Sequence, residues 1–473
     1  MQQVSQNQPT AIVIFGGTGD LAKTKLFPAL LDLYAAGQLP EEFGIIGLSR
    51  KELTDEEYQK FVSESIAEKD HEHDESVIHN FCMHIRYVAG NFGDEAAYGR
   101  IKKSLGLIDD SIGQCTNKLF YLAVPPQYYE VIFEHLHTSQ ALELCSGIDS
   151  WSRLLVEKPF GRDLETAQAL EEKLCSLFEE EQIYRIDHYL AKDAIENILA
   201  LRFVNTILAD SWNGEAIESI HIKLLETKDV SNRGSFYDAI GTLRDVGQNH
   251  LLQIFSLLTM PRVDIRDPEE VRTGRASALR LLEECHPEEI VRGQYNGYAE
   301  THGVDDSSQT ETYFKFNFML ADDRWDGTRF TLEAGKALIE KINEAVVTFR
   351  PSDKCSCGFS DDTHEHRNVL RIKFAPIEQM CLTMWTKASG FDFDLQEQEL
   401  VLEERDASAV RSPEAYEKVL FDCIVGDQTR FVSSDEVRLA WRFITPILER
   451  FSELPLQPYE KGSAGPTDDI SNT

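Results

Sequence analysis

The sequence predicts two domains. Residues 10–186 are expected to form a Rossmann-type α/β domain with a doubly wound parallel sheet, and residues 187–473 an α+β domain with a large, mainly antiparallel sheet. In the first part, short apolar runs alternate with amphipathic stretches, which is typical of parallel strands joined by crossover helices. In the second part, apolar and polar residues alternate along several segments, as they do in half-exposed antiparallel strands.

The expected elements of the first domain follow one another as strand, helix, strand. The run "AIVIF" at residues 11–15 is continuously apolar, as in a strand buried on both faces, and it leads into a glycine turn and an amphipathic helix that ends near Gly37. Thr54 and Glu57 match a capping box at the start of the next helix. The stretch between residues 67 and 116 is polar and irregular, and we assign no element to it. Further strands are expected at residues 43–50, 117–124, 152–160 and 182–186, and further helices at residues 55–66, 125–138 and 163–178.

The second domain is expected to begin with a helix over residues 196–203, because "ENILALRF" combines good helix formers with an apolar stripe. Strands with alternating polarity are expected at residues 216–227, 312–320, 345–350 and 368–376. No internal repeat or low-complexity linker is visible between the two parts.

Composition places the chain among soluble globular proteins. Its 473 residues are 42% hydrophobic and 27% charged, and no long apolar run predicts a transmembrane helix. The N-terminus lacks the regions of a signal peptide, and nine cysteines without a regular framework favour a reducing, cytoplasmic location. The formal charge of −34 argues against nucleic acid and anionic membranes as partners. An anionic ligand would therefore need a local cluster of basic residues.

The turn "GGTGDL" follows the first strand and opens the first helix, where a Rossmann domain binds the pyrophosphate of a dinucleotide. The second strand ends in Ser49, Arg50 and Lys51, where an NAD enzyme would place an acidic residue for the ribose 2′-hydroxyl. Arg50 can pair with a 2′-phosphate, so the expected cofactor is NADP. The alternative is that these residues form a solvated basic turn that does not bind a cofactor. The residues expected to bind the cofactor in the glycine turn are Gly16, Gly17, Thr18, Gly19, Asp20 and Leu21.

Four polar residues, Asp187, His188, Tyr189 and Lys192, follow the last strand of the first domain in "RIDHYLAKD". Open α/β sheets bind ligands at the carboxyl ends of their strands. His188 and Lys192 are four residues apart, so we expect them on one face of the first turn of a helix, whose free amides and dipole would complete a phosphate site. The alternative is structural: Asp187 caps the helix, Lys192 lies on the surface and His188 packs against its neighbours.

These motifs together resemble glucose-6-phosphate dehydrogenases. The resemblance rests on "FGGTGDLAKTKLFPALLDLY" near the N-terminus, "EKPFG", "RIDHYLAKD", "VGQNHLLQ" and "AYEKVLFDCIVGD", which occur in the family's order and together extend over nearly the whole chain. It implies the oxidation of glucose 6-phosphate at C1 to 6-phosphoglucono-1,5-lactone, the first step of the oxidative pentose phosphate pathway, with hydride transfer to NADP. We also expect a homodimer or homotetramer.

The resemblance assigns roles to individual residues. His250 would be the general base that removes the C1 hydroxyl proton, and Asp187 would orient it. Arg50 would meet the 2′-phosphate of NADP, and Lys158 would bridge cofactor and substrate. The residues that would contact the substrate or its phosphate are His188, Tyr189, Lys192, Glu226, Asp245, Lys336, Lys341, Lys158 and Lys23.

Five residues depart from the family's pattern. Ala191 and Asp193 stand where the family has glycine and glutamate, Glu333 and Ala334 stand where it has arginine and threonine, and Ala464 stands where it has tryptophan. None of these positions is one to which the resemblance assigns chemistry.

Two groups of residues also have a plain structural interpretation. By periodicity His250 lies on an apolar helix face, where a histidine is usually part of the core. Cys355, Cys357, His364 and His366 are zinc ligands by type, but their spacing matches no zinc-finger pattern and dehydrogenation needs no metal. We therefore predict no metal site and treat these residues as part of a polar loop.

Two other functions remain open. A Gfo/Idh-type oxidoreductase acting on an unphosphorylated sugar would share the glycine turn and the "EKP" motif, but it has no use for His188 and Lys192. A non-catalytic paralogue that binds metabolites is suggested by Ala191, Asp193 and Glu333.

Overall fold

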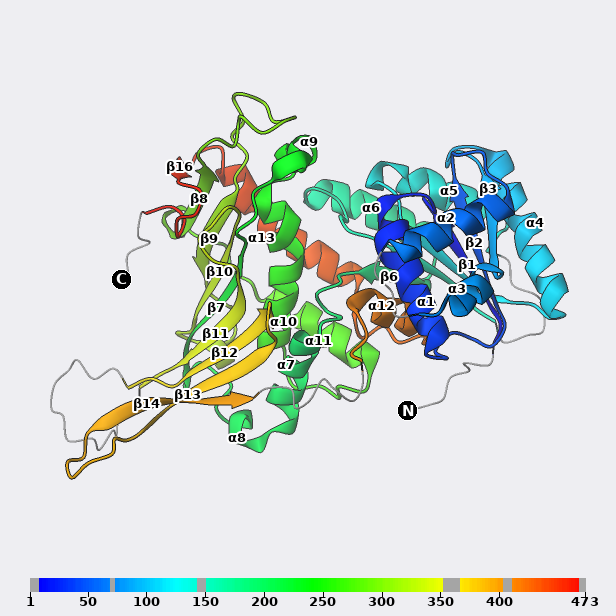
Figure 1. Ribbon diagram of the computed structural model, residues 1–473. Coiled ribbons are helices and arrows are strands. Elements are labelled where there is room, and N and C mark those ends of the chain that lie inside the picture. Colours follow the sequence, from blue (N-terminus) through cyan, green and yellow to red (C-terminus); the bar gives the residue numbers. More distant parts are fainter. Residues whose placement is uncertain (1–7, 69–72, 143–149, 352–365, 403–410, 468–473) are drawn as a thin grey trace. The chain divides into compact units, whose positions relative to one another are not determined.

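The computed structural model describes residues 8–68, 73–142, 150–351, 366–402 and 411–467 (Figure 1). The chain forms two compact units. Unit 1 comprises Met1–Gly161, Glu165–Ala191 and Ser412–Val437, and unit 2 comprises Arg162–Leu164, Lys192–Arg411 and Arg438–Thr473.

The sheet of unit 1 has seven strands in the order β15-β6-β5-β4-β1-β2-β3. All neighbouring strands are parallel except β15, which pairs with β6 in the antiparallel direction. The predicted Rossmann-type sheet is therefore confirmed, with one short antiparallel strand added at its edge. The strands are β1 (Thr10–Phe15), β2 (Phe43–Ser49), β3 (Ile85–Ala89), β4 (Asn117–Leu122), β5 (Ser152–Val156), β6 (Ile183–Ile186) and β15 (Phe431–Val432).

Helices pack on the strands of unit 1 because the strands are apolar on both faces. Every residue of β1 is buried, as its continuous apolar run predicts. Ile12 and Ile14 share a core with Phe27 and Leu30 of the first helix. The helices are α1 (Phe27–Ala35), α2 (Asp55–Ala67), α3 (Glu75–Cys82), α4 (Glu95–Ile112), α5 (Tyr129–Thr138), α6 (Leu164–Leu177) and α12 (Ala415–Val425).

Two parts of unit 1 were not predicted. Residues 67–116 contain α3, β3 and α4, although the sequence appeared irregular there. Ser412–Val437 was assigned to the C-terminal domain, but it returns to unit 1: β15 extends the sheet, and Val419 and Leu420 of α12 join the core beside α1. The division after residue 186 therefore does not describe the two compact units, because long-range pairing brings the later segment back.

The sheet of unit 2 has nine strands in the order β14-β13-β12-β11-β7-β10-β9-β8-β16. It is mainly antiparallel, as predicted, and among the described strands the parallel pairs are β10 with β7 and β16 with β8. The strands are β7 (Ile217–Leu225), β8 (Ile290–Tyr295), β9 (Tyr313–Phe318), β10 (Arg329–Gly335), β11 (Ile342–Phe349), β12 (Val369–Ala375), β13 (Gln379–Lys387), β14 (Leu395–Leu402) and β16 (Leu456–Tyr459).

Unit 2 also contains helices and a projecting hairpin. The helices are α7 (Asp193–Val204), α8 (Thr206–Ala209), α9 (Gly234–Asp238), α10 (Leu252–Thr259) and α11 (Pro268–Arg280), while α13 (Ser434–Arg450) begins in unit 1 and continues here. Strands β13 and β14 extend beyond the other strands as a two-stranded arm (Figure 1). Phe391, between these strands, has a fully exposed side chain.

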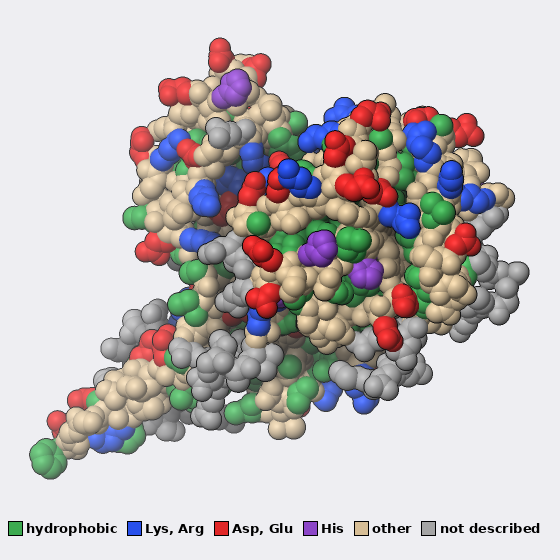
Figure 2. All heavy atoms as spheres, turned by 45° about the vertical axis from the view of Figure 1, so that its right-hand side comes forward, with side chains coloured by type: hydrophobic (Ala, Val, Ile, Leu, Met, Phe, Trp, Pro, Cys, Tyr) green, Lys and Arg blue, Asp and Glu red, His purple; other side chains and the backbone are tan. Residues whose placement is uncertain are grey.

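Acidic and basic side chains are mixed on the face drawn in Figure 2. Figure 2 shows aspartate and glutamate side chains spread over the drawn face, with lysine and arginine between them. Within the described residues, no helix is long and apolar enough to span a membrane. In the same residues Cys115 takes part in a disulfide bond, and the free thiols are those of Cys82, Cys175, Cys285, Cys381 and Cys423.

Candidate active site

The glycine turn after β1 packs tightly against its own sheet. Gly16 has φ +82°, and a Cβ atom there would lie 2.3 Å from the carbonyl oxygen of Ala123, next to the end of β4. A Cβ atom on Gly17 would lie 2.4 Å from the Tyr58 hydroxyl. The amide of Gly19 donates to the Gly16 carbonyl at 2.8 Å. Packing alone requires glycine at the first two positions, and the close turn that results is the form in which a backbone approaches a pyrophosphate.

A buried hydroxyl connects the end of β2 to this turn. Ser49 accepts a hydrogen bond from Thr18 Oγ1 at 2.9 Å and lies 2.8 Å from the hydroxyl of Tyr87. Arg50 and Lys51, which follow, are exposed. Two cations thus follow Ser49 directly at the strand end, before Glu52, which fits a dinucleotide that carries a 2′-phosphate.

Glu157, at the end of β5, is a residue to which the sequence analysis assigned no role. Its Oε1 accepts a hydrogen bond from the Tyr121 hydroxyl at 2.5 Å. Desolvation raises the pKa of Glu157, the charge of Asp187 adds to this, and hydrogen bonds from Tyr121 and Tyr416 with the charge of Lys158 act in the opposite direction. Glu157 is therefore electrostatically coupled to two residues of the predicted site. Its place before Lys158, at the carboxyl end of a parallel strand, was the available signal.

The segment from Asp187 to Lys192 is a turn, so the prediction that it opens a helix is wrong. Asp187 is buried, its Oδ1 accepts from the Tyr189 amide at 3.0 Å, and its carbonyl accepts from the Leu190 amide at 3.0 Å. Helix α7 begins at Asp193, and Lys192 is its N-cap residue in an extended conformation. A carboxylate that bonds the backbone two residues further on stabilises a turn in competition with a helix.

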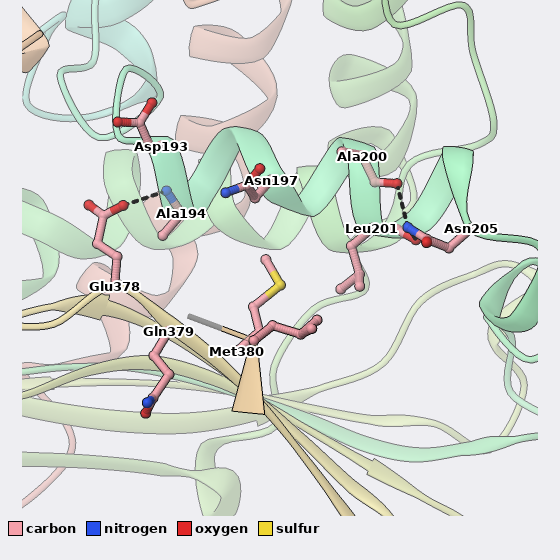
Figure 3. A pocket seen from close by; sticks show the side chains of 10 residues that line it. Asp193, Ala194, Asn197, Ala200, Leu201, Asn205, Glu378, Gln379 and Met380 are labelled. Atoms are coloured by element: carbon pink, nitrogen blue, oxygen red, sulfur yellow. Dashed lines mark hydrogen bonds between the residues drawn. The ribbon is translucent and has the colours of Figure 1, made fainter. Parts of the chain in front are cut away.

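The first turn of α7 is also less open to an anion than expected. The Ala194 amide donates to Glu378 Oε2 at 2.8 Å, as Figure 3 shows. Asp193 adds a second carboxylate at this helix start, which borders a cavity of about 280 Å³ lined also by Asn197 and Met380. A carboxylate therefore already accepts from one of the helix amides, so the predicted phosphate site would have to rely on side chains rather than on the helix start.

His188 contacts the segment that returns to unit 1. Its ring is stacked on that of Tyr416 in α12, with centroids 6.4 Å apart and planes at 15°. Tyr416 also hydrogen-bonds Glu157, and burial, followed by the charge of Glu157, raises its pKa. The motif "AYEKVLFDCIVGD" therefore contributes a side chain beside the predicted phosphate ligand, although the sequence analysis gave it no role.

Unit 2 brings three of the predicted substrate residues together. Lys336, directly after β10, forms an ion pair with Glu226 at 2.5 Å and lies 3.9 Å from Asp245. Its ammonium lies 5.2 Å from the centre of the Tyr237 ring, and its carbonyl accepts from the Tyr459 hydroxyl at 2.8 Å. The cluster places one ammonium between two carboxylates, a set that can donate to and accept from sugar hydroxyls.

Two other predicted lysines, Lys23 and Lys341, form no ion pair with this cluster within the described residues. Lys23 pairs with Glu68 at 2.6 Å in unit 1, and its amide donates to the Gly19 carbonyl at 3.0 Å. Lys341 is exposed on the turn before β11.

His250 is buried within Leu243–Leu251, a nine-residue π-helical segment that precedes α10. Stretches of π-helix are rare and frequently occur at functional sites. The apolar spacing that suggested an α-helical core face does not apply, because i→i+5 bonding changes the angle between successive side chains. His250 belongs to unit 2 and Asp187 to unit 1. Burial fits both interpretations of His250, and the unusual helix favours the functional one.

The residues that depart from the family's pattern are accommodated locally. Ala191 is buried in the core cluster of unit 1, and Ala464 is exposed. Glu333 is buried on β10, where it accepts from the Tyr313 hydroxyl at 2.8 Å and lies 2.8 Å from His221 Nε2. Neighbours on the sheet thus compensate for the unexpected carboxylate.

Of the possible zinc ligands, Cys355, Cys357 and His364 lie outside the described residues. His366 lies inside them, and its ring packs against Trp385 with centroids 4.2 Å apart.

Comparisons with known proteins cover the same span as the motifs. The family model described as the NAD binding domain of glucose-6-phosphate dehydrogenase matches residues 13–197, and the model of its C-terminal domain matches residues 199–471. Glucose-6-phosphate 1-dehydrogenase 6, cytoplasmic, of Arabidopsis thaliana is 35% identical over 467 residues, which are 97% of this chain and 89% of that protein. Glucose-6-phosphate 1-dehydrogenase of Chlamydia muridarum is 34% identical over 481 residues, with 97% and 94% covered.

Solved structures give the same result. A glucose-6-phosphate dehydrogenase in complex with its substrate glucose-6-phosphate matches with a TM-score of 0.89 at 35% identity, covering 97% of this chain and 96% of that one. A levoglucosan dehydrogenase in complex with NADH matches with a TM-score of 0.53 at 11% identity, covering 94% and 98%. The second likeness shows the fold alone.

Proposed function

The chain belongs to the glucose-6-phosphate dehydrogenase family, and from this premise we propose how its residues carry out the family's reaction. Glucose 6-phosphate is oxidised at C1 to 6-phosphoglucono-1,5-lactone, the first step of the oxidative pentose phosphate pathway. C1 loses a hydride and its hydroxyl loses a proton. NADP, when bound, accepts the hydride. The observation that supports this most directly is the full-length match to a family member in complex with glucose 6-phosphate.

His250 is the general base of this reaction. A hydride leaves an alcohol carbon readily only as the hydroxyl proton is removed, so the reaction needs a base whose pKa lies near the working pH. Histidine meets this requirement, and a carboxylate on its second ring nitrogen holds the correct tautomer and stabilises the imidazolium. Asp187 takes that part. The π-helical segment that carries His250 also carries Asp245, a proposed sugar ligand.

Substrate recognition is divided between a phosphate group and a sugar ring. His188, Tyr189 and Lys192 hold the phosphate through charged and polar side chains. Glu226 and Asp245 bind sugar hydroxyls. The basic residues that complete the substrate site are Lys336, Lys341, Lys158 and Lys23.

The NADP site comprises the glycine turn and the end of β2. The turn formed by Gly16, Gly17, Thr18, Gly19, Asp20 and Leu21 holds the pyrophosphate, Arg50 pairs with the 2′-phosphate, and Lys158 lies between cofactor and substrate. The amides of Gly16 and Gly17 donate to the Leu48 carbonyl and that of Gly19 to the Gly16 carbonyl, so these three amides shape the turn. The tight turn at Gly16 and the hydrogen bond between Thr18 and Ser49 support this arrangement.

A spectrophotometric assay of reduced nicotinamide tests the proposal. The purified chain is mixed with glucose 6-phosphate or glucose, each with NADP or NAD. Turnover is expected with glucose 6-phosphate and NADP. Preference for glucose would indicate a Gfo/Idh-type oxidoreductase. The similarity to levoglucosan dehydrogenase does not favour that function, because at 11% identity it shows the fold alone. Saturable binding of glucose 6-phosphate without turnover would indicate a metabolite-binding paralogue.

We also infer a cytoplasmic homo-oligomer, a dimer or a tetramer. Strand β14 is at the edge of its sheet, and its last three residues have exposed apolar side chains, with Leu400 at 56%, Val401 at 43% and Leu402 at 65%. Exposed apolar surface on an edge strand favours pairing with another chain. Light scattering coupled to size exclusion tests this: a monomer at micromolar concentration would contradict it, and Leu400→Lys is expected to shift an oligomer towards monomer.

A further inference from the structure

Glu311, shortly before β9, is a buried carboxyl without a role in the proposal above. Its side chain contacts the start of the π-helical segment Leu243–Leu251. Oε1 accepts a hydrogen bond from the Leu243 amide at 2.9 Å, and the residue is 4% exposed. The Glu311 carbonyl accepts from the amide and the hydroxyl of Thr242 at 3.2 and 3.1 Å. Glu311 therefore binds both Thr242 and Leu243, the two residues at which the π-helical segment begins.

The carboxylate of Glu311 packs directly against the backbone of Gly241. Gly241 has φ +74°, a left-handed conformation, and a Cβ atom there would lie 2.4 and 2.6 Å from the two carboxylate oxygens of Glu311. Only glycine permits both the backbone conformation and the close approach. The carboxylate thus occupies the space that a side chain at residue 241 would fill.

The segment that begins at Leu243 carries Asp245 and His250. The first amides of a helix have no partner within it, and a carboxylate at this end is also favoured by the helix dipole. The direction of each later side chain depends on where the helix begins. We propose that Glu311 is a positioning residue of the reaction: its carboxylate fixes the start of the π-helical segment and thereby orients Asp245 and His250. This rests on the proposed function of those two residues.

Keeping a carboxylate in this place lowers the stability of the folded chain. Burial raises the pKa of Glu311 to about 7, although the Leu243 amide and two guanidinium groups favour ionisation. A carboxyl whose pKa is raised on folding binds its proton more tightly in the folded state, so stability falls as the pH rises from the ordinary pKa of 4.5 to about 7, and this loss is complete above that pH. The charged and titratable side chains that face Glu311 are Arg244, Arg292, Tyr237 and Tyr298, and burial raises the pKa of both phenols far above the working range.

If Glu311 is a positioning residue, its replacement should lower kcat but raise the melting temperature. A residue that only packs would lower both. Glu311→Gln keeps the size of the side chain and an acceptor for Leu243, but it removes the charge. We expect kcat to fall about ten- to a hundredfold, as for small misplacements of reacting groups. The KM for NADP should not change, because its proposed residues belong to unit 1. The melting temperature should exceed that of the wild type at about pH 8, and the difference should shrink towards about pH 6.

Glu436→Gln is the matched control, because Glu436 is a fully buried carboxylate that accepts from the Ser433 amide at 2.8 Å at the start of α13. It should lower the melting temperature and leave kcat unchanged. Gly241→Ala, which pushes on the Glu311 carboxylate, should lower kcat as well. Wild-type kcat in Glu311→Gln, or a parallel loss of kcat and melting temperature, would overturn the proposal. If Glu311→Gln does not fold, wild-type kcat in Gly241→Ala overturns it instead. An inactive wild type would refute the proposed function itself.

Discussion

Replacing Arg50 by alanine is expected to weaken the use of NADP and to leave the use of NAD almost unchanged. Arg50 follows β2, whose last residue, Ser49, is hydrogen-bonded to Thr18 of the glycine turn. A hydrogen bond to a charged group contributes roughly 1.5–3 kcal/mol. Arg50 is exposed, and solvent and salt screen exposed charges, so the lower end of that range applies. About 1.4 kcal/mol corresponds to a factor of ten, which predicts a rise of about tenfold in the KM for NADP.

The assay measures initial rates with each cofactor at saturating glucose 6-phosphate, at low and at physiological salt. Lys51→Ala is the matched control, because Lys51 is also exposed but presents a point charge rather than the planar fork that binds phosphate bidentately. Its effect should be smaller than that of Arg50→Ala. Equal increases in the KM for NADP and for NAD in Arg50→Ala would refute the assignment, because NAD has no 2′-phosphate to lose.

Three other substitutions test the site and its support. Lys192→Ala should raise the KM for glucose 6-phosphate by one to two decades, from roughly 1.5–3 kcal/mol of a charge-assisted contact, and spare residual glucose oxidation; equal loss with both sugars would contradict a phosphate contact. His250→Asn should lower kcat by about two to four decades with substrate binding intact, and Asp187→Asn should lower it too; a His250→Asn enzyme that keeps most of its activity excludes the base. Glu171→Gln should lower the free energy of unfolding by about 3–5 kcal/mol in urea titrations, because it leaves the buried guanidinium of Arg185 incompletely paired; a loss below about 1 kcal/mol would show that Glu180 suffices.

The parts of the fold that could be predicted are those whose burial shows in local sequence. The run at β1 is buried on both faces and therefore continuously apolar. β3, by contrast, is an edge strand whose residues are buried only in part, so it gave a weaker signal within residues 67–116. Helix α4 does have a capping residue at its start, Asp94, and a left-handed glycine at its end, Gly113. These signals were not recognised because the helix is polar on average. The return of Ser412–Val437 to unit 1 depends on pairing with β6, which no local pattern encodes.

The residue types of the site were predictable, whereas the backbone that presents them was not. Spacing predicted a helical turn at Asp187, but its carboxylate forms a competing backbone hydrogen bond. The π-helical segment around His250 could not be recognised, because apolar spacing is interpreted with the α-helical period. The role proposed for Glu311 could not be predicted for a different reason. Its carboxylate accepts from the amide of Leu243, which is far away in sequence.

The formal charge of −34 led us to expect a local excess of lysines around an anionic substrate. In the structure, two of the proposed site lysines are instead individually paired, Lys336 with Glu226 and Lys23 with Glu68. The side chain of Lys336 is only 16% exposed, and a buried ammonium without a partner would be costly. A phosphate that approaches such a lysine exchanges one anionic partner for another, so each lysine adds less affinity than an unpaired cation would. Discrimination is not lost in this exchange. Glucose offers no charge to compete for the ammonium, so we expect a phosphorylated sugar to gain more from these lysines than glucose does.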